Sequence, residues 1–541
     1  MFPRLEETIR EQMDERPVAG LSIALVRSGD VVWEQAYGTA SVETGDAVTP
    51  GTAFAIMSVT KTMISTALMQ LRDEGHFQLN HPANKYLTPA HIQNAWEDES
   101  PVRIGQFMTH TSGLPVGIGP TPPGKTPLEQ FVSVVGRCER RPGDEILYAN
   151  WGFDAIGVLI SRFSGKSVDD YLHDRIFEPL GMSTAVLGDP LPDVPHATGH
   201  FRSFVDAHIR TLPLPDWPTI PASPAGAVWA TARDVSRFLA AHLSGGAPLL
   251  APNTVEEMHR LHVRQANSAS GMGLGFRVTR SNGRRLVCHG GDGSGFTAFL
   301  GGYPDEGVGV VLLMNTAGMQ VARSVIANTA LALLVDAGAP RVFGPAKLSP
   351  GLYQSTFWDI EVEARAGDAP MLTTTEGLVV ADEAGESHLT PIADSTFAAE
   401  DGMFHGFEVS VLGDHVVGGV YPFTFVRTGD LPIDNKPVDE EADLVGTWIG
   451  TVRTPIGPLS TTITVSESAA MIASPLGGEQ PLENFCANHG RLEGEFGMSV
   501  PGLGDFQNFV RLAAIGGRLI GKVFARGNQG ETGMLAELDR K

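Results

Sequence analysis

The sequence predicts a chain of α/β (α+β) class, in which a large domain precedes two small antiparallel β-barrel domains. The large domain is expected to hold one antiparallel sheet flanked by helices, together with a helical subdomain. Three observations predict this. The 541 residues are too many for one hydrophobic core, so two or three domains are expected. Helical periodicity runs through about the first 340 residues, and after about Pro345 short alternating stretches separated by Gly, Asp and Pro replace it.

The N-terminal segment alternates between helix and strand patterns. Leu5 to Met13 has the period of a helix, and Leu21–Val26 and Val31–Tyr37 form a hairpin around the turn Ser28-Gly29-Asp30. From Val59 the apolar period is again that of a helix, which Gly75 is placed to end.

The middle of the large domain, about residues 80–240, is rich in Pro and Gly and contains short helical pieces, so it predicts a mainly helical subdomain. Strands from both ends of the large domain, with helices between them, indicate one antiparallel sheet with helices on its faces. The predicted elements are helices over Asn150–Ser164 and Ala232–His242, strands over Arg285–His289, Phe296–Tyr303 and Val308–Asn315, and a helix from about Gln320 to Ala337.

The tail reads as two β-domains of similar build. The polar stretch 427–443 contains two prolines and a run of acids, and predicts a linker. Each side of it has a tryptophan strand and a Phe-Val-Arg triplet: Thr356-Phe357-Trp358 with 425–427, and Gly446-Thr447-Trp448 with 509–511. The expected domains are therefore 1–340, a barrel or sandwich over 346–428, and a second, lipocalin-like barrel over 444–541.

Composition limits the partners and the compartment. A net charge of −23 argues against nucleic acid and against an anionic membrane surface, both of which need clustered Lys and Arg. Cys138, Cys288 and Cys486 lie far apart without CxxC spacing, which fits a reducing compartment. No basic and apolar leader begins the chain, and no apolar run is long enough to span a bilayer, so a cytoplasmic protein is expected.

Ser58-Val59-Thr60-Lys61 is the strongest chemical signal. Lys61 is the only lysine with a serine three positions before it, and positions i and i+3 at a helix start share a face. A buried lysine loses proton affinity and can act as a base toward the hydroxyl, while the helix N-terminus favours developing negative charge. The motif is short, and on its own it would more often be an ordinary surface Ser and Lys.

Tyr148-Ala149-Asn150 follows the turn signal Arg141-Pro142-Gly143, which predicts a loop position for the tyrosine. A phenol near an ammonium is stabilised as phenolate and can carry a proton from a serine to a leaving group. The alternative is a half-buried tyrosine that packs and donates one hydrogen bond.

His289-Gly290-Gly291-Asp292 closes a predicted strand. Small residues there would let a substrate backbone approach the strand edge. The backbone N–H of Asp292 could then serve as an oxyanion donor beside that of Ser58. Taken alone, His289 would more often be structural.

The order Ser-x-x-Lys, Tyr-x-Asn, His-x-Gly resembles the class C β-lactamase superfamily, a penicillin-binding-protein-like group that includes D-aminopeptidases, D-alanyl-D-alanine carboxypeptidases and family VIII esterases. The resemblance covers about residues 15–340. It implies a β-lactamase/transpeptidase-like fold, Ser58 as nucleophile, Lys61 and Tyr148 as acid/base pair, Asn150 as a substrate residue and His289 as a positioning group. Further matching segments are Thr109–Pro115, which contains His110 as a structural residue, Tyr148–Gly152, Ala230–Asp234 and Gly273–Phe276.

The third motif departs from that of true β-lactamases, where Lys-Thr-Gly places a cation opposite the antibiotic's carboxylate. His289 stands there instead and is mostly neutral at pH 7. A neutral residue there shifts the expectation toward esters, amides or peptides. The His-x-Gly motif and the two β-domains of the tail resemble those of D-aminopeptidase, which favours amides or peptides, including D-configured ones, through an acyl-enzyme on Ser58. A carboxylesterase acting on short-chain esters is the nearest alternative. A β-lactamase, an acyltransferase and a non-catalytic penicillin sensor are further ones.

No cofactor and no metal are expected. His196 and His200 have helical ligand spacing but lie among Pro and Gly, and they lack the Glu of a zinc site. His259 and His262 are expected on an exposed helix face. The expected partner is a small ester, amide or short peptide, and a homodimer is left open.

Overall fold

The chain divides into two compact units, and the main boundary between them in the sequence follows residue 342. The computed structural model describes residues 2–335 except 17, 116–126, 189–190, 203–208, 212–223, 265–269 and 282; only the strands and residue 439 between 336 and 440; and 441–541 except 455–456, 467, 489, 501–503, 516 and 528–529.

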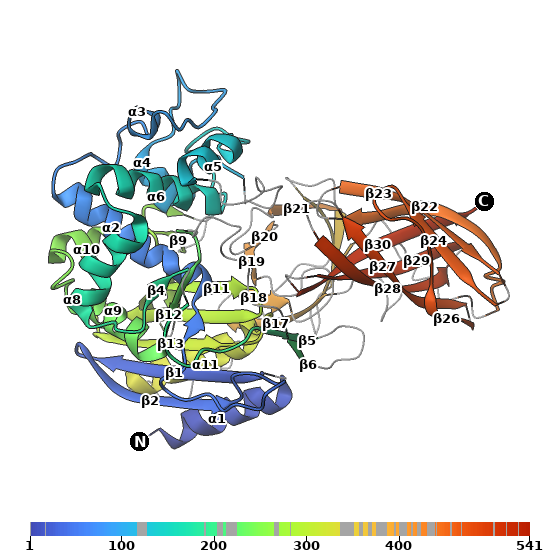
Figure 1. Ribbon diagram of the computed structural model, residues 1–541, viewed down its shortest axis with the longest axis horizontal. Helices are drawn as coiled ribbons and strands as arrows, with labels where there is room; N and C mark the ends of the chain where they lie inside the picture. The colour runs from blue at the N-terminus through green and yellow to red at the C-terminus, as the bar shows by residue number, and fades with distance from the viewer. Residues whose placement is uncertain are drawn as a thin grey trace. The chain divides into compact units, whose positions relative to one another are not determined.

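The first unit is built on an eight-stranded antiparallel sheet with the order β2-β1-β13-β12-β11-β10-β9-β8 (Figure 1). The first and last parts of the unit therefore meet in one sheet, since β1 lies between β2 and β13. The strands are β1 (Gly20–Arg27), β2 (Asp30–Gly38), β8 (Val263–Arg264), β9 (Gly271–Met272), β10 (Arg277–Ser281), β11 (Arg284–Gly293), β12 (Phe296–Tyr303) and β13 (Val308–Met314).

The central strands contribute to two hydrophobic clusters, one on each face of the sheet, since alternate side chains point to opposite sides. Ile23 and Leu312 belong to one hydrophobic cluster, which includes residues of α1 (Pro3–Glu15) and α11 (Gln320–Leu334). Their neighbours Ala24 and Leu313 belong to a second cluster, which includes the helical region. Strand β13, which lies between β1 and β12, is therefore apolar and buried along its whole length.

Helix α2 (Thr60–Asp73) is the centre of the helical region. All its residues from Thr60 to Leu71 are buried, and it packs against α6 (Asn150–Ser164). The other helical elements are α3 (Asn84–Leu87), α4 (Ile104–Met108), α5 (Leu128–Val135), α7 (Val168–Leu172), a π-helical turn (His173–Phe177), α8 (Glu178–Leu180), α9 (Ala232–Leu243) and α10 (Pro252–His259). There are also two small sheets. The first has the strand order β3 (Phe54–Ala55), β7 (Val228–Ala230) and β4 (Val186–Leu187), and the second pairs β5 (His200–Arg202) with β6 (Ile209–Thr211).

The predicted order of elements is confirmed in this unit. The expected helix over Asn150–Ser164 and the strand over Phe296–Tyr303 have the predicted bounds. One strand is longer than expected, because β11 continues through the glycines to Gly293 instead of ending at His289. The last predicted helix ends at Leu334, and Asp336 and Ala337 lie outside the described residues.

The tail contains two separate sets of strands (Figure 1). Eight strands form a closed antiparallel barrel: β14 (Gly351–Ser355), β15 (Glu361–Arg365), β16 (Met371–Thr374), β17 (Ser387–Ala393), β18 (Thr396–Ala399), β19 (Glu408–Leu412), β20 (His415–Gly418) and β21 (Thr424–Gly429). The predicted linker therefore begins later than residue 427, since β21 runs to Gly429. The expected strand at Thr356-Phe357-Trp358 lies outside the described residues.

The second set is a nine-stranded antiparallel sheet with the order β25-β24-β23-β22-β30-β29-β28-β27-β26. Its two edge strands follow each other in the chain with only Leu482 between them, so the sheet curls round into a nearly closed barrel. The strands are β22 (Gly446–Thr454), β23 (Gly457–Val465), β24 (Ala470–Ser474), β25 (Gly478–Pro481), β26 (Glu483–Asn488), β27 (Arg491–Val500), β28 (Gly504–Ile515), β29 (Arg518–Gly527) and β30 (Gly530–Arg540). Two β-domains over 346–428 and 444–541 agree with these two sets, while the domain boundaries stay predictions.

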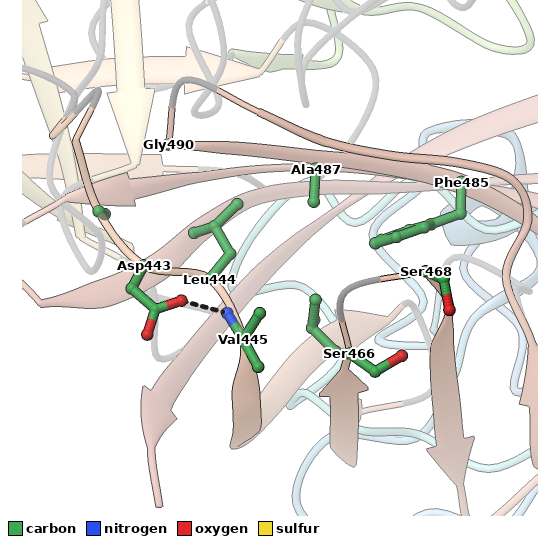
Figure 2. A pocket seen from close by; sticks show the side chains of 10 residues that line it. Asp443, Leu444, Val445, Ser466, Ser468, Phe485, Ala487 and Gly490 are labelled. Atoms are coloured by element: carbon green, nitrogen blue, oxygen red, sulfur yellow. Dashed lines mark hydrogen bonds between the residues drawn. The ribbon is translucent and has the colours of Figure 1, made fainter.

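One pocket of about 440 Å³ lies in the second set, beside the segment that leads into β22 (Figure 2). Asp443 and Leu444 line it from that segment, Ser466 and Ser468 from the turn before β24, and Phe485 from β26. The Asp443 carboxylate there accepts a hydrogen bond from the Val445 N–H and pairs with Arg540. Within the described ranges, no helix is both long and apolar enough to cross a bilayer.

Candidate active site

Ser58 and Lys61 lie at the junction between a 3₁₀ turn (Met57–Val59) and α2. The Lys61 Nζ lies 3.0 Å from the Ser58 Oγ and donates to the Ala225 carbonyl oxygen at 2.5 Å. Lys61 is fully buried, whereas Ser58 is half-buried and so keeps a path to solvent. The predicted i, i+3 contact is present, with the hydroxyl on the outer side and the amine beneath it.

Burial lowers the pKa of Lys61 from 10.5 to about 7, because the ammonium loses its hydration. Asp154, which is buried on α6, acts in the opposite direction and raises this pKa. Lys61 therefore changes charge near neutral pH. When neutral, its Nζ can accept the Ser58 hydroxyl proton across the same 3.0 Å contact.

Tyr148 comes from the loop before α6 and is almost fully buried. The Lys61 Nζ lies 5.0 Å from the centroid of its ring. The rings of His110 and Tyr148 have centroids 4.1 Å apart. The structure thus brings Ser58, Lys61 and Tyr148 into one cluster, as the sequence predicts.

Strand β11 lies directly against the turn that carries Ser58. A Cβ atom on Gly291 would lie 2.3 Å from the Ile56 carbonyl oxygen and 3.2 Å from the Ser58 nitrogen. The glycine is required by the protein's own backbone at this crossing, and not only by an approaching substrate. It places the amide groups of β11 beside the amide of Ser58.

The edge of β11 changes partner at the same point. β10 pairs with β11 only from Arg284 to Cys288, whereas β12 pairs with it as far as Gly293. Among the described strands, the segment 289–293 therefore has a paired edge and an edge without a strand partner. An extended substrate could add to such an edge through backbone hydrogen bonds.

His289 is buried, and its pKa is lowered to about 3, mainly by burial and further by the positive charge of Lys61. Its Nδ1 lies 2.6 Å from the Gly290 carbonyl oxygen, so this nitrogen carries the proton and donates. Arg277 and Arg323 also lower this pKa. The imidazole is therefore neutral at pH 7, as expected, but it has cationic neighbours that the sequence did not reveal.

The Asp292 side chain serves a separate purpose from its backbone. Its carboxylate oxygens accept hydrogen bonds from the Gln320 Nε2 at 2.9 Å and from the Arg323 Nη1 at 2.8 Å. Arg323 is nearly buried on α11, and its Nη1 would be 3.0 Å from a Cβ on Gly290. This ion pair fastens β11 to α11.

Asn150 is the first residue of α6 and is half-buried, next in the chain to the tyrosine loop. One helical turn later, Asp154 is buried where it influences Lys61. Three contributors to the site were missed from the sequence: Asp154, Ala225 and Arg323. The spacing Asn150 to Asp154 could have revealed the first, since residues i and i+4 share a helix face.

The histidines outside this cluster have structural partners. The Nε2 of His200 accepts a hydrogen bond from the Val42 N–H, and its Nδ1 lies 2.8 Å from the Asn315 carbonyl oxygen, so neither nitrogen is left for a metal. The expectation for His259 is wrong. It is buried, because the rings of His242 on α9 and of Phe276 pack against it, and its Nε2 contacts the His242 Nδ1 at 3.2 Å.

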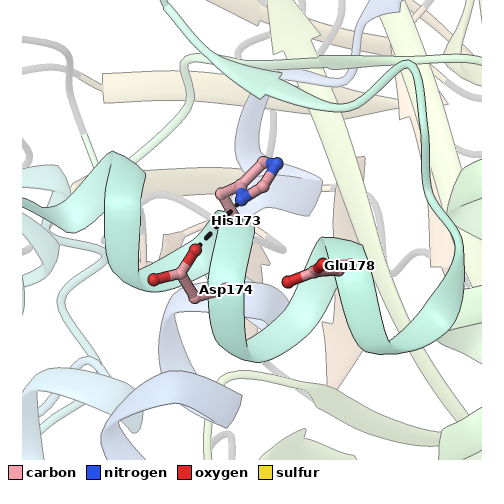
Figure 3. A group of neighbouring side chains, drawn as sticks. All are labelled: His173, Asp174 and Glu178. Atoms are coloured by element: carbon pink, nitrogen blue, oxygen red, sulfur yellow. Dashed lines mark hydrogen bonds and ion pairs between the residues drawn. The ribbon is translucent and has the colours of Figure 1, made fainter.

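His173, Asp174 and Glu178 form a group of potential metal ligands on the helical surface (Figure 3). Asp174 is already paired with Lys166 and with His173. Exposed groups of this kind are common on helices, and we assign no metal to them.

Comparison with known proteins gives a consistent picture. The family profile described as "Beta-lactamase" matches residues 5–334. The chain is 29% identical over 351 residues to "Penicillin-binding protein 4" of Amycolatopsis lactamdurans, and the matched region covers 61% of this chain and 90% of that protein.

Two solved structures share the fold. The octameric penicillin-binding protein homologue from Pyrococcus abyssi has a TM-score of 0.57 at 24% identity, covering 79% of this chain and 99% of that one. The D-amino acid amidase from Ochrobactrum anthropi SV3, complexed with L-phenylalanine amide, has a TM-score of 0.52 at 24% identity, covering 62% and 99%. With the family profile matching well over half of its length, this chain belongs to the beta-lactamase family.

Proposed function

We propose that this protein is a serine hydrolase that forms an acyl-enzyme on Ser58 and cleaves amide or peptide bonds. The observation that carries the proposal is the 3.0 Å contact between the Ser58 Oγ and a fully buried lysine amine whose pKa is about 7. A buried amine that is half neutral at working pH is suited to general-base catalysis.

In the first step Ser58 Oγ attacks the substrate carbonyl carbon, and its proton passes to Lys61. Tyr148, close to the Lys61 amine, relays this proton to the departing nitrogen as the C–N bond breaks. The negative oxygen of the tetrahedral intermediate is held by the backbone N–H groups of Ser58 and Asp292. The crossing at Gly291 supports this pairing, since it brings β11 against the Ser58 amide.

In the second step water attacks the acyl carbon and gives a proton to the same base. The bond between the acyl carbon and the Ser58 Oγ then breaks, Ser58 regains that proton, and the carboxylic acid is released. Asn150 is assigned to the substrate amide and His289 to positioning at the strand edge. A neutral imidazole at position 289 favours substrates without an obligatory carboxylate.

The preferred substrates are D-aminoacyl amides or short peptides. One of the structures with this fold is a D-amino acid amidase. The alternative is a carboxylesterase acting on short-chain esters, because an alkoxide leaving group uses the same residues. Transfer of the acyl group to an alcohol or amine, β-lactam hydrolysis and a sensor that is acylated without turnover remain further alternatives.

Labelling with a fluorophosphonate tests the nucleophile, with Ser58→Ala as control. A covalent adduct on Ser58 of the wild type, absent in the variant, is the expected result. Labelling elsewhere, or none, contradicts the proposal.

Turnover of D- and L-aminoacyl p-nitroanilides compared with short p-nitrophenyl esters then separates the substrate classes. We expect hydrolysis of the anilides. If only esters react, the amidase assignment falls, and if Ser58 is labelled without turnover of any substrate, the protein is a sensor.

A further inference from the structure

The ring of His110 packs against the ring of Tyr148, although the proposed mechanism gives His110 no role. It follows α4 and lies in the left-handed region of the backbone, with φ at 56°. Its main-chain carbonyl accepts the Leu147 N–H at 2.7 Å, and its Nδ1 accepts the Ala149 N–H at 3.1 Å. One residue therefore binds the N–H groups of both chain neighbours of Tyr148, Leu147 and Ala149.

The ring of His110 also supports the phenol. The two ring centroids are 4.1 Å apart with a tilt of 32°, and Phe153 packs against the imidazole at 5.4 Å. The Lys61 amine lies 5.0 Å from the centroid of the Tyr148 ring, so the phenol has both an imidazole and an amine as neighbours.

His110 is an unfavourable residue for stability alone. A non-glycine residue in the left-handed region is strained, although His tolerates that region better than most residues do. Because Nδ1 accepts from Ala149, the proton is on Nε2, and this buried nitrogen has no hydrogen-bond partner among the described residues. An unsatisfied buried donor is costly. Such costs concentrate at functional sites.

The neutral form is essential to this arrangement. A protonated Nδ1 could not accept the Ala149 N–H, and the ring would then repel Lys61. Burial, Lys61 and His289 hold the pKa of His110 well below its usual value, so the acceptor persists at neutral and mildly acidic pH.

We propose that His110 is a positioning residue for Tyr148, whose backbone it holds on both sides and whose ring it supports, and that it thereby fixes the phenol relative to Lys61 and Ser58. The inference rests on the proposed function, because it concerns the same proton relay. His110 itself does not touch the reacting atoms.

Two substitutions separate the contacts. His110→Gly removes the ring and the Nδ1 acceptor and suits the positive φ, so backbone strain does not confound it. His110→Asn places an amide oxygen where Nδ1 lies and also tolerates this backbone, but it removes the stacking. His242→Asn is the matched control, because His242 is equally buried and lies in a different cluster.

The readouts are the second-order rate of fluorophosphonate labelling, its final stoichiometry, and kcat and KM per labelled site. We expect His110→Gly to slow labelling and kcat by about 100-fold, the scale of a misplaced catalytic group. Stoichiometry should stay at one per chain, with KM changed less than about twofold. His110→Asn should lose only about tenfold, because it restores the Ala149 contact. His242→Asn should lower the melting temperature and leave the rate per site unchanged.

Equal rates per site in wild type and both His110 variants would overturn the inference and leave a structural role only. If the glycine variant does not fold, His110→Asn decides alone: a loss of about tenfold supports the inference, and a rate within about twofold of wild type overturns it. If the wild type is labelled normally and His110→Gly is labelled at the same rate, the inference about His110 is wrong and the proposed function stands. If the wild type is neither labelled nor able to turn over any substrate, the proposed function is wrong, and so is the inference that rests on it.

Discussion

Two clusters of buried polar side chains lie along α2. The first surrounds Ser58 and Lys61 at its N-terminal end, and the second joins Thr66 in its middle to His242 on α9 and His259 on α10. Both contain basic groups whose pKa is lowered by burial, to about 7 for Lys61 and about 3 for His242.

The second cluster is a closed chain of hydrogen bonds. Thr66 donates to the Thr62 carbonyl, so its oxygen accepts from the His242 Nε2, and the His242 Nδ1 is left to accept from the His259 Nε2. All three side chains are buried, and no nucleophile among them reaches solvent.

The first cluster has an open side. Ser58 is half-buried, the adjoining segment of β11 has an edge without a strand partner in the described structure, and His110 keeps an unsatisfied Nε2. Depressed pKa values alone therefore do not distinguish a catalytic site from a structural one. Access for a substrate and a hydroxyl beside the perturbed base make the difference.

The largest expected effect comes from Ser58→Ala, compared with Thr66→Val in the closed cluster. Ser58→Ala should lower kcat/KM more than about 1,000-fold and change the free energy of unfolding by less than about 0.5 kcal/mol. Thr66→Val should do the reverse. It should lower the free energy of unfolding by roughly 1–3 kcal/mol, because the His242 Nε2 loses its hydrogen-bond acceptor, and it should leave the activity per site unchanged. Kinetics and urea unfolding of both variants check this. Full activity in Ser58→Ala would break the comparison.

Lys61→Met should abolish activity and raise stability by roughly 1–3 kcal/mol, because it replaces a group that folding forces to give up its charge. The sign follows from the pKa values. Since the folded-state pKa is about 7 and the unfolded one is 10.5, the unfolded chain binds more protons between these values, and wild-type stability rises with pH there. Unfolding at pH 6 and pH 9 should show a larger gain for the variant at pH 6. An equal or smaller gain at pH 6 contradicts the assigned pKa.

Asp154→Asn sharpens the comparison by altering only the charge near Lys61. Removal of a carboxylate that raises the pKa of Lys61 should move the acid limb of the kcat/KM profile to lower pH. The profile is measured beside that of the wild type with one substrate. An acid limb that stays in place, or moves upward, means that Asp154 does not act on the catalytic base.

The smallest expected effect is that of His289→Lys on substrate choice. A lysine there should increase hydrolysis of a carboxylate-bearing β-lactam relative to a neutral ester. The gain should be modest, since the cations that lower the pKa of His289 would act on a lysine in the same way. The ratio of the two kcat/KM values is the readout, and an unchanged ratio means that position 289 does not read the carboxylate.

Sequence patterns predicted most of the large domain because its elements have strong periodicity. The all-apolar strand at Val308–Met314 and the helix over Asn150–Ser164 are examples. The patterns failed where tertiary contacts override local signals. Gly290 to Gly293 suggested the end of a strand, yet β11 continues because Gly291 lets it cross the Ser58 turn.

The motif residues of the site were predictable, while its supporting groups were not. Ser58, Lys61 and Tyr148 lie in short patterns that can be recognised in one dimension. Ala225 reaches Lys61 across 164 residues of sequence and Arg323 reaches Asp292 across 31, so only the fold brings these groups together. The burial of His259 depends in the same way on two side chains that the fold brings to it, those of His242 and Phe276.

The pH dependence of Ser58 acylation in the wild type tests the central claim most directly. The account predicts that the second-order rate of fluorophosphonate labelling rises with pH to a plateau, with a midpoint near pH 7 where Lys61 becomes neutral. A rate that is constant from pH 5 to 9, or that rises only near the ordinary lysine value of 10.5, would contradict it.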